Sequence, residues 1–322
     1  MRAAVYESRG ASDVLQVKEV PTPGPGVGEV RLRLHVAAVN PTDWKARKSG
    51  GDLDAGFQIP GQDGAGVIEA VGPGVDLGRI GERAWVYHAA YERPFGTAAQ
   101  YTVVPARQAV RIPEGIGFDQ AAALGIPYIT AYGCLFSDGP IDGQTILVHG
   151  GAGAVGHAAI QLARRAGAHV ITTVSSKAKA AIATSAGAHV IVDYTQKSAL
   201  EQIAAAARAG VDRIIEVDLT HNLELDRAVI VPHGVIVTYA ADANDPTVPV
   251  RALMNGNVTL RFVMVYGFTP SMIAAAIDDI TRGLVDGDLA PLPVIRFSLD
   301  QIAAAHDAVE KRSTGKVLID LP

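Results

Sequence analysis

The stretch ILVHGGAGAVGHAAIQLA (146–163) decides the fold of this chain. Gly151, Gly153 and Gly156 form a G-x-G-x-x-G pattern that follows an apolar strand and opens an apolar helix. The first glycine permits a tight turn, the second lets the backbone approach a pyrophosphate, and the third lets helix and strand pack closely. The helix N-terminus then offers free N–H groups to phosphate. The pattern predicts a dinucleotide site, with an ordinary glycine-rich turn as the alternative.

Strands and helices alternate from residue 145 to about residue 240. The predicted strands cover 145–150, 169–174, 189–194, 211–218 and 234–240. The predicted helices between them cover 157–167, 177–187, 198–210 and 223–234. This alternation is typical of βαβ units and of a doubly wound parallel sheet. A further helix is predicted at 270–287.

The end of the second of these strands carries the signal for cofactor choice. A site selective for NAD places Asp or Glu there to bind the ribose 2′-hydroxyl. The segment ITTVSSKAKA (171–180) has no acidic residue and carries Ser175, Ser176, Lys177 and Lys179. Hydroxyl and ammonium groups suit a 2′-phosphate, so the segment predicts NADPH. The alternative is a serine N-cap with solvated lysines, and both can hold because a cap and a phosphate site share a helix start.

The first 110 residues follow a different pattern. VRLRLHVAAV (30–39) alternates polar and apolar residues, which predicts a half-buried strand. Further short strands are expected within 65–75, 81–89 and 98–105. Short strands separated by Gly/Pro turns indicate a barrel-like domain. Segment 118–136 predicts a helix interrupted at Pro127, and the tail from 298 predicts a helix and a last strand that return to the first domain.

Composition narrows the class of protein. At roughly 100–200 residues per domain, 322 residues predict two domains. The net charge of −5, from 28 basic and 33 acidic residues, argues against nucleic acid as a partner. The single cysteine, Cys134, excludes an internal disulfide and a cysteine-rich metal site. No signal peptide and no apolar run of about 18 residues is seen, so we expect a cytoplasmic protein without membrane segments.

Several segments together carry a resemblance to a known family. They are PGQDGAGVIEAVGPGV (60–75), IGERAWV (80–86), ALGIPYITAYGCL (123–135), the stretch 146–163, VIVDY (190–194) and STGKVLIDL (313–321). In this order the whole chain resembles the medium-chain dehydrogenase/reductase family, in its zinc-free quinone oxidoreductase (zeta-crystallin-like) branch. The resemblance implies an α/β protein with two domains. They are a GroES-like β-barrel catalytic domain at 1–120, completed by 267–322, and a Rossmann doubly wound NADP(H) domain at 121–266.

The positions that hold zinc in related dehydrogenases differ in this chain. Asn40 stands where the resemblance implies a cysteine ligand, and Gln62-Asp63 stands where it implies His-Glu. The link 87–101 is short and lacks the cysteines of a structural zinc lobe. Because neutral amides are poor zinc ligands, we expect no metal. His149, beside the glycine-rich turn, is interpreted as structural rather than as a ligand.

The resemblance also implies site residues. The catalytic candidates are Asn40, whose amide would bind a carbonyl or the nicotinamide ribose, and Tyr128. The implied cofactor contacts are Thr130, Gly151, Gly153, Ala154, Val155, Gly156, Ser175, Ser176, Lys179, Tyr194, Tyr239 and Lys316. The implied substrate-pocket residues are Asp43, Gln62, Phe262 and Met264. Each role has a structural alternative: a turn before Pro41 for Asn40, core packing for Tyr128, solvation for Lys316, and a core or dimer strand for Phe262 with Met264.

These observations predict an NADPH-dependent, metal-free oxidoreductase. Its implied substrates are quinones or α,β-unsaturated carbonyls, which accept a hydride because the developing charge spreads onto oxygen. The alternatives are an enoyl-thioester or alkenal reductase of the same fold and a non-catalytic, crystallin-like NADPH-binding protein. A zinc alcohol dehydrogenase is disfavoured by the missing ligands. The resemblance further implies a homodimer and a small-molecule substrate between the two domains.

Overall fold

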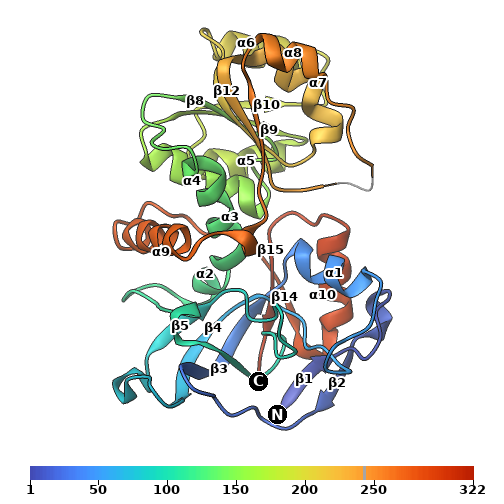
Figure 1. Cartoon of the computed structure of the whole chain (residues 1–322), viewed down its shortest axis with the longest axis vertical. Helices are drawn as coiled ribbons and strands as arrows, with labels where there is room; N and C mark the ends of the chain where they lie inside the picture. The colour runs from blue at the N-terminus through green and yellow to red at the C-terminus, as the bar shows by residue number, and fades with distance from the viewer. Residues whose placement is uncertain (242–243) are drawn as a thin grey trace. The chain divides into compact units, whose positions relative to one another are not determined.

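The computed structural model describes residues 1–241 and 244–322 (Figure 1). The chain divides into two compact units. Unit 1 comprises Met1–Ile126 and Pro291–Pro322, and unit 2 comprises Pro127–Ala290. The end of the chain therefore returns to unit 1, as expected for a tail without a further βαβ partner.

Unit 1 consists mainly of β-strands. Its main sheet has the order β14-β15-β3-β4-β5-β7, with β6 paired to β3. These strands are β3 (Glu29–Ala38), β4 (Asp63–Val71), β5 (Arg83–Val86), β6 (Tyr101–Pro105), β7 (Ala109–Arg111), β14 (Val294–Ser298) and β15 (Lys316–Asp320). Only β14 and β15 pair in parallel. A separate antiparallel pair joins β1 (Arg2–Val5) to β2 (Gln16–Glu19).

Strand β3 shows how the alternating pattern builds the core of unit 1. Val30, Leu32 and Leu34 are at most 1% exposed and pack in one apolar cluster, whereas Arg33 and His35 face solvent. Each such buried side chain contributes about 1.5–3 kcal/mol relative to exposure. The half-buried strand predicted over 30–39 is confirmed.

Helices and short 3₁₀ turns connect the strands of unit 1. The helices are α1 (Pro41–Lys48), α2 (Phe118–Ala122) and α10 (Ile302–Glu310). The 3₁₀ turns are η1 (Ser12–Val14), η2 (Leu77–Arg79), η3 (Ala106–Gln108) and η5 (Leu299–Gln301). Helix α3 (Gly125–Phe136) begins at the end of unit 1 and continues into unit 2.

Unit 2 contains a parallel sheet of six strands in the order β10-β9-β8-β11-β12-β13. The strands are β8 (Thr145–Val148), β9 (His169–Val174), β10 (Val190–Asp193), β11 (Val211–Glu216), β12 (Ile230–Thr238) and β13 (Thr259–Phe262). The chain runs outward from β8 to β10, then returns to β11 beside β8. In such sheets ligands bind at the carboxyl ends of the strands where the order reverses, here between β8 and β11.

Helices flank this sheet (Figure 1). They are α4 (Ala154–Arg165), α5 (Lys177–Ser185), α6 (Ala199–Ala206), α7 (Leu219–Val229), α8 (Val250–Asn255) and α9 (Pro270–Val285), with the 3₁₀ turn η4 (Val265–Gly267). The doubly wound parallel sheet predicted from the alternation is confirmed. Among the described residues, no helix is both long and apolar enough to cross a membrane.

Unit 2 extends further along the chain than the domain prediction. We expected residues from 267 onward to complete the first domain, but α9 belongs to unit 2. Arg165, at the end of α4, pairs with Asp286 and Asp288 just after α9. Ala276 and Ile280 of α9 are buried. Packing and ion pairs thus hold α9 in unit 2, and the return to unit 1 begins at Pro291.

The helix expected over 118–136 is split before Pro127 rather than at it. Helix α2 ends at Ala122, and α3 starts at Gly125. Pro127 lies in the first turn of α3, where a helix needs no N–H donor. The proline therefore starts a helix instead of interrupting one.

The helix expected over 223–234 ends earlier. Helix α7 stops at Val229, and β12 already begins at Ile230. Pro232 disfavours a continuing helix because it lacks an N–H donor. His233 has a φ of 64°, a left-handed conformation that also ends regular helix.

Candidate functional site

The glycine-rich turn lies in unit 2, between β8 and α4. A Cβ added at Gly156 would lie 2.3 Å from the Gly150 carbonyl oxygen, and one at Gly151 would lie 2.1 Å from Thr172 Oγ1. Gly150 has a φ of 70°, which favours glycine. These residues therefore form a close backbone cradle of the kind that a pyrophosphate needs.

Helix α4 starts directly from this cradle. Gly153 is its N-cap and provides no side-chain cap, and Ala154 and Val155 form the first turn. A helix leaves its first N–H groups without intrahelical partners. With the helix dipole, these groups attract phosphate. The residues present thus fit the phosphates of a dinucleotide.

The residues predicted to select NADPH lie together at the ends of β9 and β10. Ser176 caps α5 by accepting the backbone N–H of Lys179 at 3.3 Å, and Lys179 Nζ donates to Ser175 Oγ at 2.9 Å. The backbone N–H of Tyr194 donates to the Val174 carbonyl at 3.0 Å, which places Tyr194 beside the end of β9. Its side chain is 54% exposed. The serine cap and a cationic site therefore coexist, as the sequence allows.

A buried polar cluster in unit 1 joins Asn40, Asp43, Asp63 and Lys316. Asn40 Nδ2 donates to Asp63 Oδ2 at 2.7 Å, and Lys316 Nζ donates to Asn40 Oδ1 at 2.6 Å. The backbone N–H of Asn40 donates to Asp43 Oδ2 at 2.7 Å, at the start of α1. All four side chains are at most 3% exposed. Asn40 therefore holds a turn and a buried ion network at once, and Lys316 is not a solvated lysine.

The cluster leaves few polar groups for a substrate. Asn40 Nδ2 carries two N–H groups, and one of them donates a hydrogen bond to Asp63. Gln62 is 6% exposed, and its Oε1 atom accepts no hydrogen bond from the described residues. The catalytic role of Asn40, the pocket roles of Asp43 and Gln62 and the cofactor contact of Lys316 stay predictions.

Burial shifts the protonation of this cluster. Burial raises the pKa of Asp43 to about 7 and that of Asp63 to about 6, while the ammonium of Lys316 opposes both shifts. Burial also lowers the pKa of Lys316, against the attraction of Asp63 and Asp43. Keeping Asp43, Asp63 and Lys316 charged inside unit 1 therefore costs desolvation free energy.

This shift predicts a pH-dependent stability. Because the folded-state pKa of Asp43 is raised, the folded protein keeps a proton that the unfolded chain releases above about pH 4. The stabilisation that this bound proton gives to the folded protein is fully present below about pH 4 and is lost as the pH rises to about 7. We expect the free energy of unfolding of the wild type, relative to Asp43→Asn, to fall over this range and then level off. Urea unfolding at several pH values measures it, and a pH-independent difference would contradict it.

Tyr128 and Thr130 lie on α3 and are buried, at 7% and 5% exposure. Gln161 Nε2 donates to the Tyr128 hydroxyl oxygen at 2.9 Å and lies 2.9 Å from His157 Nδ1. Gln161 Oε1 accepts the backbone N–H of Ala290 at 2.5 Å. This last bond fixes which end of the amide is oxygen.

Gln161 therefore decides the direction of the Tyr128 hydroxyl. The phenol oxygen accepts from the amide, so its own proton points to another acceptor. None of the described residues supplies that acceptor. Burial raises the pKa of Tyr128, which keeps the hydroxyl protonated. The hydroxyl of Tyr128 can thus donate a hydrogen bond, although the side chain is buried in the core. Its catalytic role stays a prediction.

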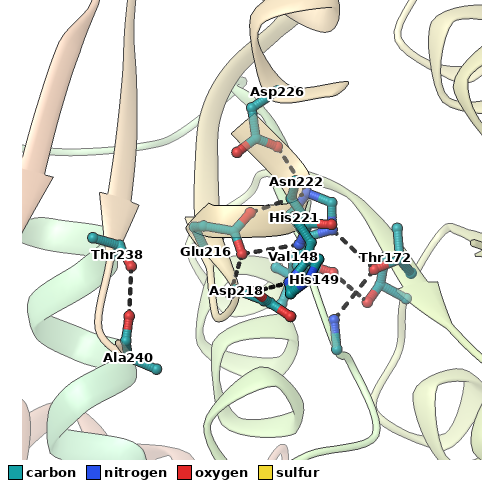
Figure 2. Close-up of polar contacts among 12 residues, drawn as sticks. Val148, His149, Thr172, Glu216, Asp218, His221, Asn222, Asp226, Thr238 and Ala240 are labelled. Carbon is teal, nitrogen blue, oxygen red and sulfur yellow. Dashed lines mark hydrogen bonds and ion pairs between the residues drawn. The ribbon is translucent and has the colours of Figure 1, made fainter. Parts of the chain in front are cut away.

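The remaining candidates follow β12 and β13, the last two strands in the order of the unit 2 sheet. Tyr239 follows β12 and is partly buried, in a turn that Thr238 Oγ1 closes by donating to the Ala240 carbonyl (Figure 2). Phe262 and Met264 are 70% and 67% exposed, at the end of the edge strand β13. Their exposure rules out the core alternative. The nicotinamide-border and dimer-strand roles stay predictions.

One cluster in unit 2 was not predicted. His149 Nε2 lies 2.9 Å from Asp226 Oδ1 and 3.5 Å from Glu216 Oε2, with all three side chains buried (Figure 2). Burial raises the pKa of Glu216. Burial alone would lower the pKa of His149, but its hydrogen bond to Asp226 and the charge of Glu216 raise it. Only His149 stood out in the sequence, because its partners are far away along the chain.

Comparison with known proteins shows the same two-part organisation. Residues 26–114 match the alcohol dehydrogenase GroES-like domain, and residues 154–282 match zinc-binding dehydrogenase. Human quinone oxidoreductase is 28% identical over 325 residues, covering 99% of this chain and 97% of that protein. A solved structure of an NAD-dependent alcohol dehydrogenase has a TM-score of 0.90 at 27% identity and covers 100% of both chains. A mycobacterial protein complexed with NADPH has a TM-score of 0.86 at 26% identity, covering 99% of this chain and 100% of that one.

Unit 1 therefore contains the GroES-like domain, and unit 2 contains the Rossmann-type domain. The chain belongs to the medium-chain dehydrogenase/reductase family. This confirms the predicted family and fold class. As a medium-chain dehydrogenase/reductase, the protein is an oxidoreductase.

The family includes zinc-binding members, but this medium-chain dehydrogenase/reductase has amides at two positions where the resemblance implies zinc ligands, and the carboxylate beside them, Asp63, accepts hydrogen bonds from Asn40 and from the backbone of Ile126. Asn40 and Gln62 offer neutral amides where zinc takes thiolate, imidazole or carboxylate. The buried ammonium of Lys316 contacts Asn40 Oδ1 at 2.6 Å and adds a positive charge there. These residues therefore do not fit a catalytic zinc ion in unit 1.

Proposed function

We propose that this protein is an NADPH-dependent reductase of quinones or α,β-unsaturated carbonyls that needs no catalytic metal. The main support comes from the residues that follow β9. Lys179 and two serines stand there, where an NAD site has an acidic residue. The glycine cradle supports it because Gly151 and Gly156 pack too closely against the turn to carry side chains, as the dinucleotide motif requires. The NADPH-bound mycobacterial structure and human quinone oxidoreductase support it by similarity.

When bound, NADPH supplies a hydride from C4 of the nicotinamide. The quinone ring or the β-carbon of an enone accepts it, and negative charge develops on the substrate oxygen. In our proposal the second N–H of Asn40 Nδ2, which does not donate to Asp63, stabilises that charge by a hydrogen bond. The hydroxyl of Tyr128, directed by Gln161, donates a hydrogen bond or the final proton.

Lys179→Ala tests the cofactor assignment. Loss of a charge-assisted contact costs about 1.5–3 kcal/mol, so we expect kcat/KM for NADPH to fall about 10- to 100-fold. The value for NADH should hardly change, because NADH has no 2′-phosphate. Steady-state kinetics with both cofactors measures the ratio.

The matched control is Lys177→Ala, which removes an exposed lysine from the first position of the same helix. It should leave the NADPH preference within about twofold of the wild type. An equal loss with NADH and NADPH in Lys179→Ala would contradict the 2′-phosphate assignment.

Tyr128→Phe tests the proposed donor. A positioned acid contributes about 10²–10⁴-fold, so we expect kcat to fall about 100-fold while KM for NADPH stays unchanged. Gln161→Glu should lower kcat in the same direction, because a carboxylate accepts the phenolic proton and turns it away from a substrate. Tyr132→Phe, on the same helix, is the control and should keep wild-type kcat. An unchanged kcat in Tyr128→Phe would remove this residue from the mechanism.

The substrate class and the assembly belong to the same proposal. Comparing kcat/KM for a benzoquinone, a simple enone and an enoyl thioester separates the quinone and enone reductase from the enoyl-thioester alternative. Tight NADPH binding without turnover on any of them would favour the non-catalytic alternative. We also propose a homodimer in the cytoplasm, supported for the dimer by Phe262 and Met264 exposed at the edge strand β13.

A further inference from the structure

Three side chains from separate elements of unit 2 meet at the carboxyl edge of its sheet (Figure 2). His149 follows β8, Glu216 ends β11, and Asp226 lies on α7. Strands β8 and β11 are parallel neighbours, and Val148 pairs with Ile215. The next residue of each strand is His149 or Glu216, so the strand register itself places these two side by side.

The spacing of the three ligand atoms fits a metal ion. His149 Nε2 is 2.9 Å from Asp226 Oδ1 and 3.5 Å from Glu216 Oε2. One such atom from each residue lies within 4.8 Å of the other two. In a tetrahedral zinc site with bonds of about 2.1 Å, ligand atoms are roughly 3.4 Å apart. The cluster needs little rearrangement to reach that geometry.

The carboxylates also keep unsatisfied oxygens. Glu216 Oε2 and Asp226 Oδ2 accept no hydrogen bond from the described residues, and both side chains are 0% exposed. Glu216 Oε1 is already occupied, because Asn222 Nδ2 donates to it at 3.0 Å and the backbone N–H of Asp218 donates to it as well. Two buried carboxylates with free oxygens and a single imidazole call for a further cation.

The second ring nitrogen of His149, Nδ1, has a hydrogen-bond partner that can orient the imidazole toward a metal ion. His149 Nδ1 lies 3.1 Å from Thr173 Oγ1, which also accepts the backbone N–H of Gly150 at 3.2 Å. In the metal-free cluster, Nε2 donates its hydrogen bond to Asp226 Oδ1 at 2.9 Å. A metal ion would displace that proton, and the ring would then keep its proton on Nδ1, donate it to Thr173 Oγ1 and bind the ion through Nε2. Metal-binding histidines are oriented in this way by an acceptor on their second nitrogen.

We propose that His149, Glu216 and Asp226 bind one divalent transition-metal ion of the Zn²⁺ class in unit 2. One imidazole nitrogen with carboxylate oxygens and no thiolate is a ligand set that suits Zn²⁺. The two carboxylates balance the two charges of the ion. The ion ties β8, β11 and α7 together beside Gly150. Its role is to stabilise unit 2, and it is independent of the proposed hydride transfer.

Zinc binding by the full-length, chelator-treated protein tests this proposal. We expect calorimetry to show one Zn²⁺ per chain and the Tm to rise by about 5 °C or more at saturation. Co²⁺ in place of Zn²⁺ should give a visible ligand-field spectrum without a thiolate band. Glu216→Gln and Asp226→Asn should each weaken zinc binding at least about 100-fold.

The control is His221→Gln, which removes an exposed histidine whose Nδ1 lies 2.7 Å from Asp218 Oδ1. It should bind zinc like the wild type, which separates the buried cluster from surface binding. Circular dichroism is measured alongside, and we expect the wild-type spectrum for Glu216→Gln.

Three results would overturn the proposal: no zinc binding by the wild type, equal binding by Glu216→Gln, or loss of binding in His221→Gln alone. Any of them would show that zinc does not bind at the buried cluster. Reductase activity does not enter the test, so its outcome and that of the proposed function are independent.

Discussion

Lys316→Met is expected to lower the free energy of unfolding of unit 1 by about 3–5 kcal/mol. The ammonium of Lys316 is buried and donates to Asn40 Oδ1 at 2.6 Å, in the cluster that contains Asp43 and Asp63. Without it, two buried carboxylates lose their nearest positive charge. Breaking a buried ion network by removing one member leaves an uncompensated charge, which is the costly case.

Denaturant unfolding followed by tryptophan fluorescence measures this loss. Both tryptophans of the chain, Trp44 and Trp85, lie in unit 1, so the signal reports on that unit. Lys18→Met is the control, because Lys18 forms an exposed pair with Glu7 and such pairs contribute less than about 1 kcal/mol.

A second substitution separates charge from packing. In the Lys316→Met background, Asp63→Asn removes one of the buried charges and should recover part of the loss. A cost in Lys316→Met no greater than in Lys18→Met, or no recovery in the double variant, would contradict the ion-network account.

Gly156→Ala is expected to weaken NADPH binding about 100-fold. Its Cβ would lie 2.3 Å from the carbonyl oxygen of Gly150, so the backbone of the cradle must move. Overpacking of this kind costs about 1–3 kcal/mol in stability, and the displaced loop no longer meets the phosphates. Isothermal titration with NADPH and thermal unfolding measure the two effects.

Gly153→Ala separates the phosphate site from the fold. Gly153 has a φ of −77°, and its nearest neighbour to an added Cβ is Gly150 O at 3.3 Å, so stability should change little. NADPH affinity should still fall about tenfold, because the methyl group enters the path of the pyrophosphate. Gly117→Ala, an N-cap glycine with a φ of −78° on α2, is the control and should leave affinity unchanged. Full affinity in Gly153→Ala would contradict the predicted cradle.

The parts of the fold predicted from the sequence are those set by local patterns. The glycine-rich turn depends on neighbours within a few residues, and Gly156 meets Gly150 as the motif requires. The parallel sheet follows from strand and helix periodicity. The groups at the end of β9 also follow from adjacent residues, since Ser176 caps the helix that carries Lys179.

The partners of buried polar groups are not predictable in this way. Lys316 reaches Asn40 across 276 residues, and His149 reaches Asp226 across 77. The sequence marked Asn40, Asp43, Lys316 and His149 as separate positions and did not show which residues each of them contacts. Gln161 was missed for the same reason, because its bonds to Tyr128 and Ala290 exist only after α3, α4 and the segment after α9 have packed.

We propose that this protein reduces its substrate with NADPH and without a catalytic metal. Cofactor oxidation with benzoquinone or an enone tests this, with NADPH and NADH in parallel and in the presence of a chelator that leaves the protein folded. We expect turnover with NADPH, a clear preference over NADH, and no loss of rate on chelation. Turnover that prefers NADH, or that appears only when zinc is restored, would contradict it.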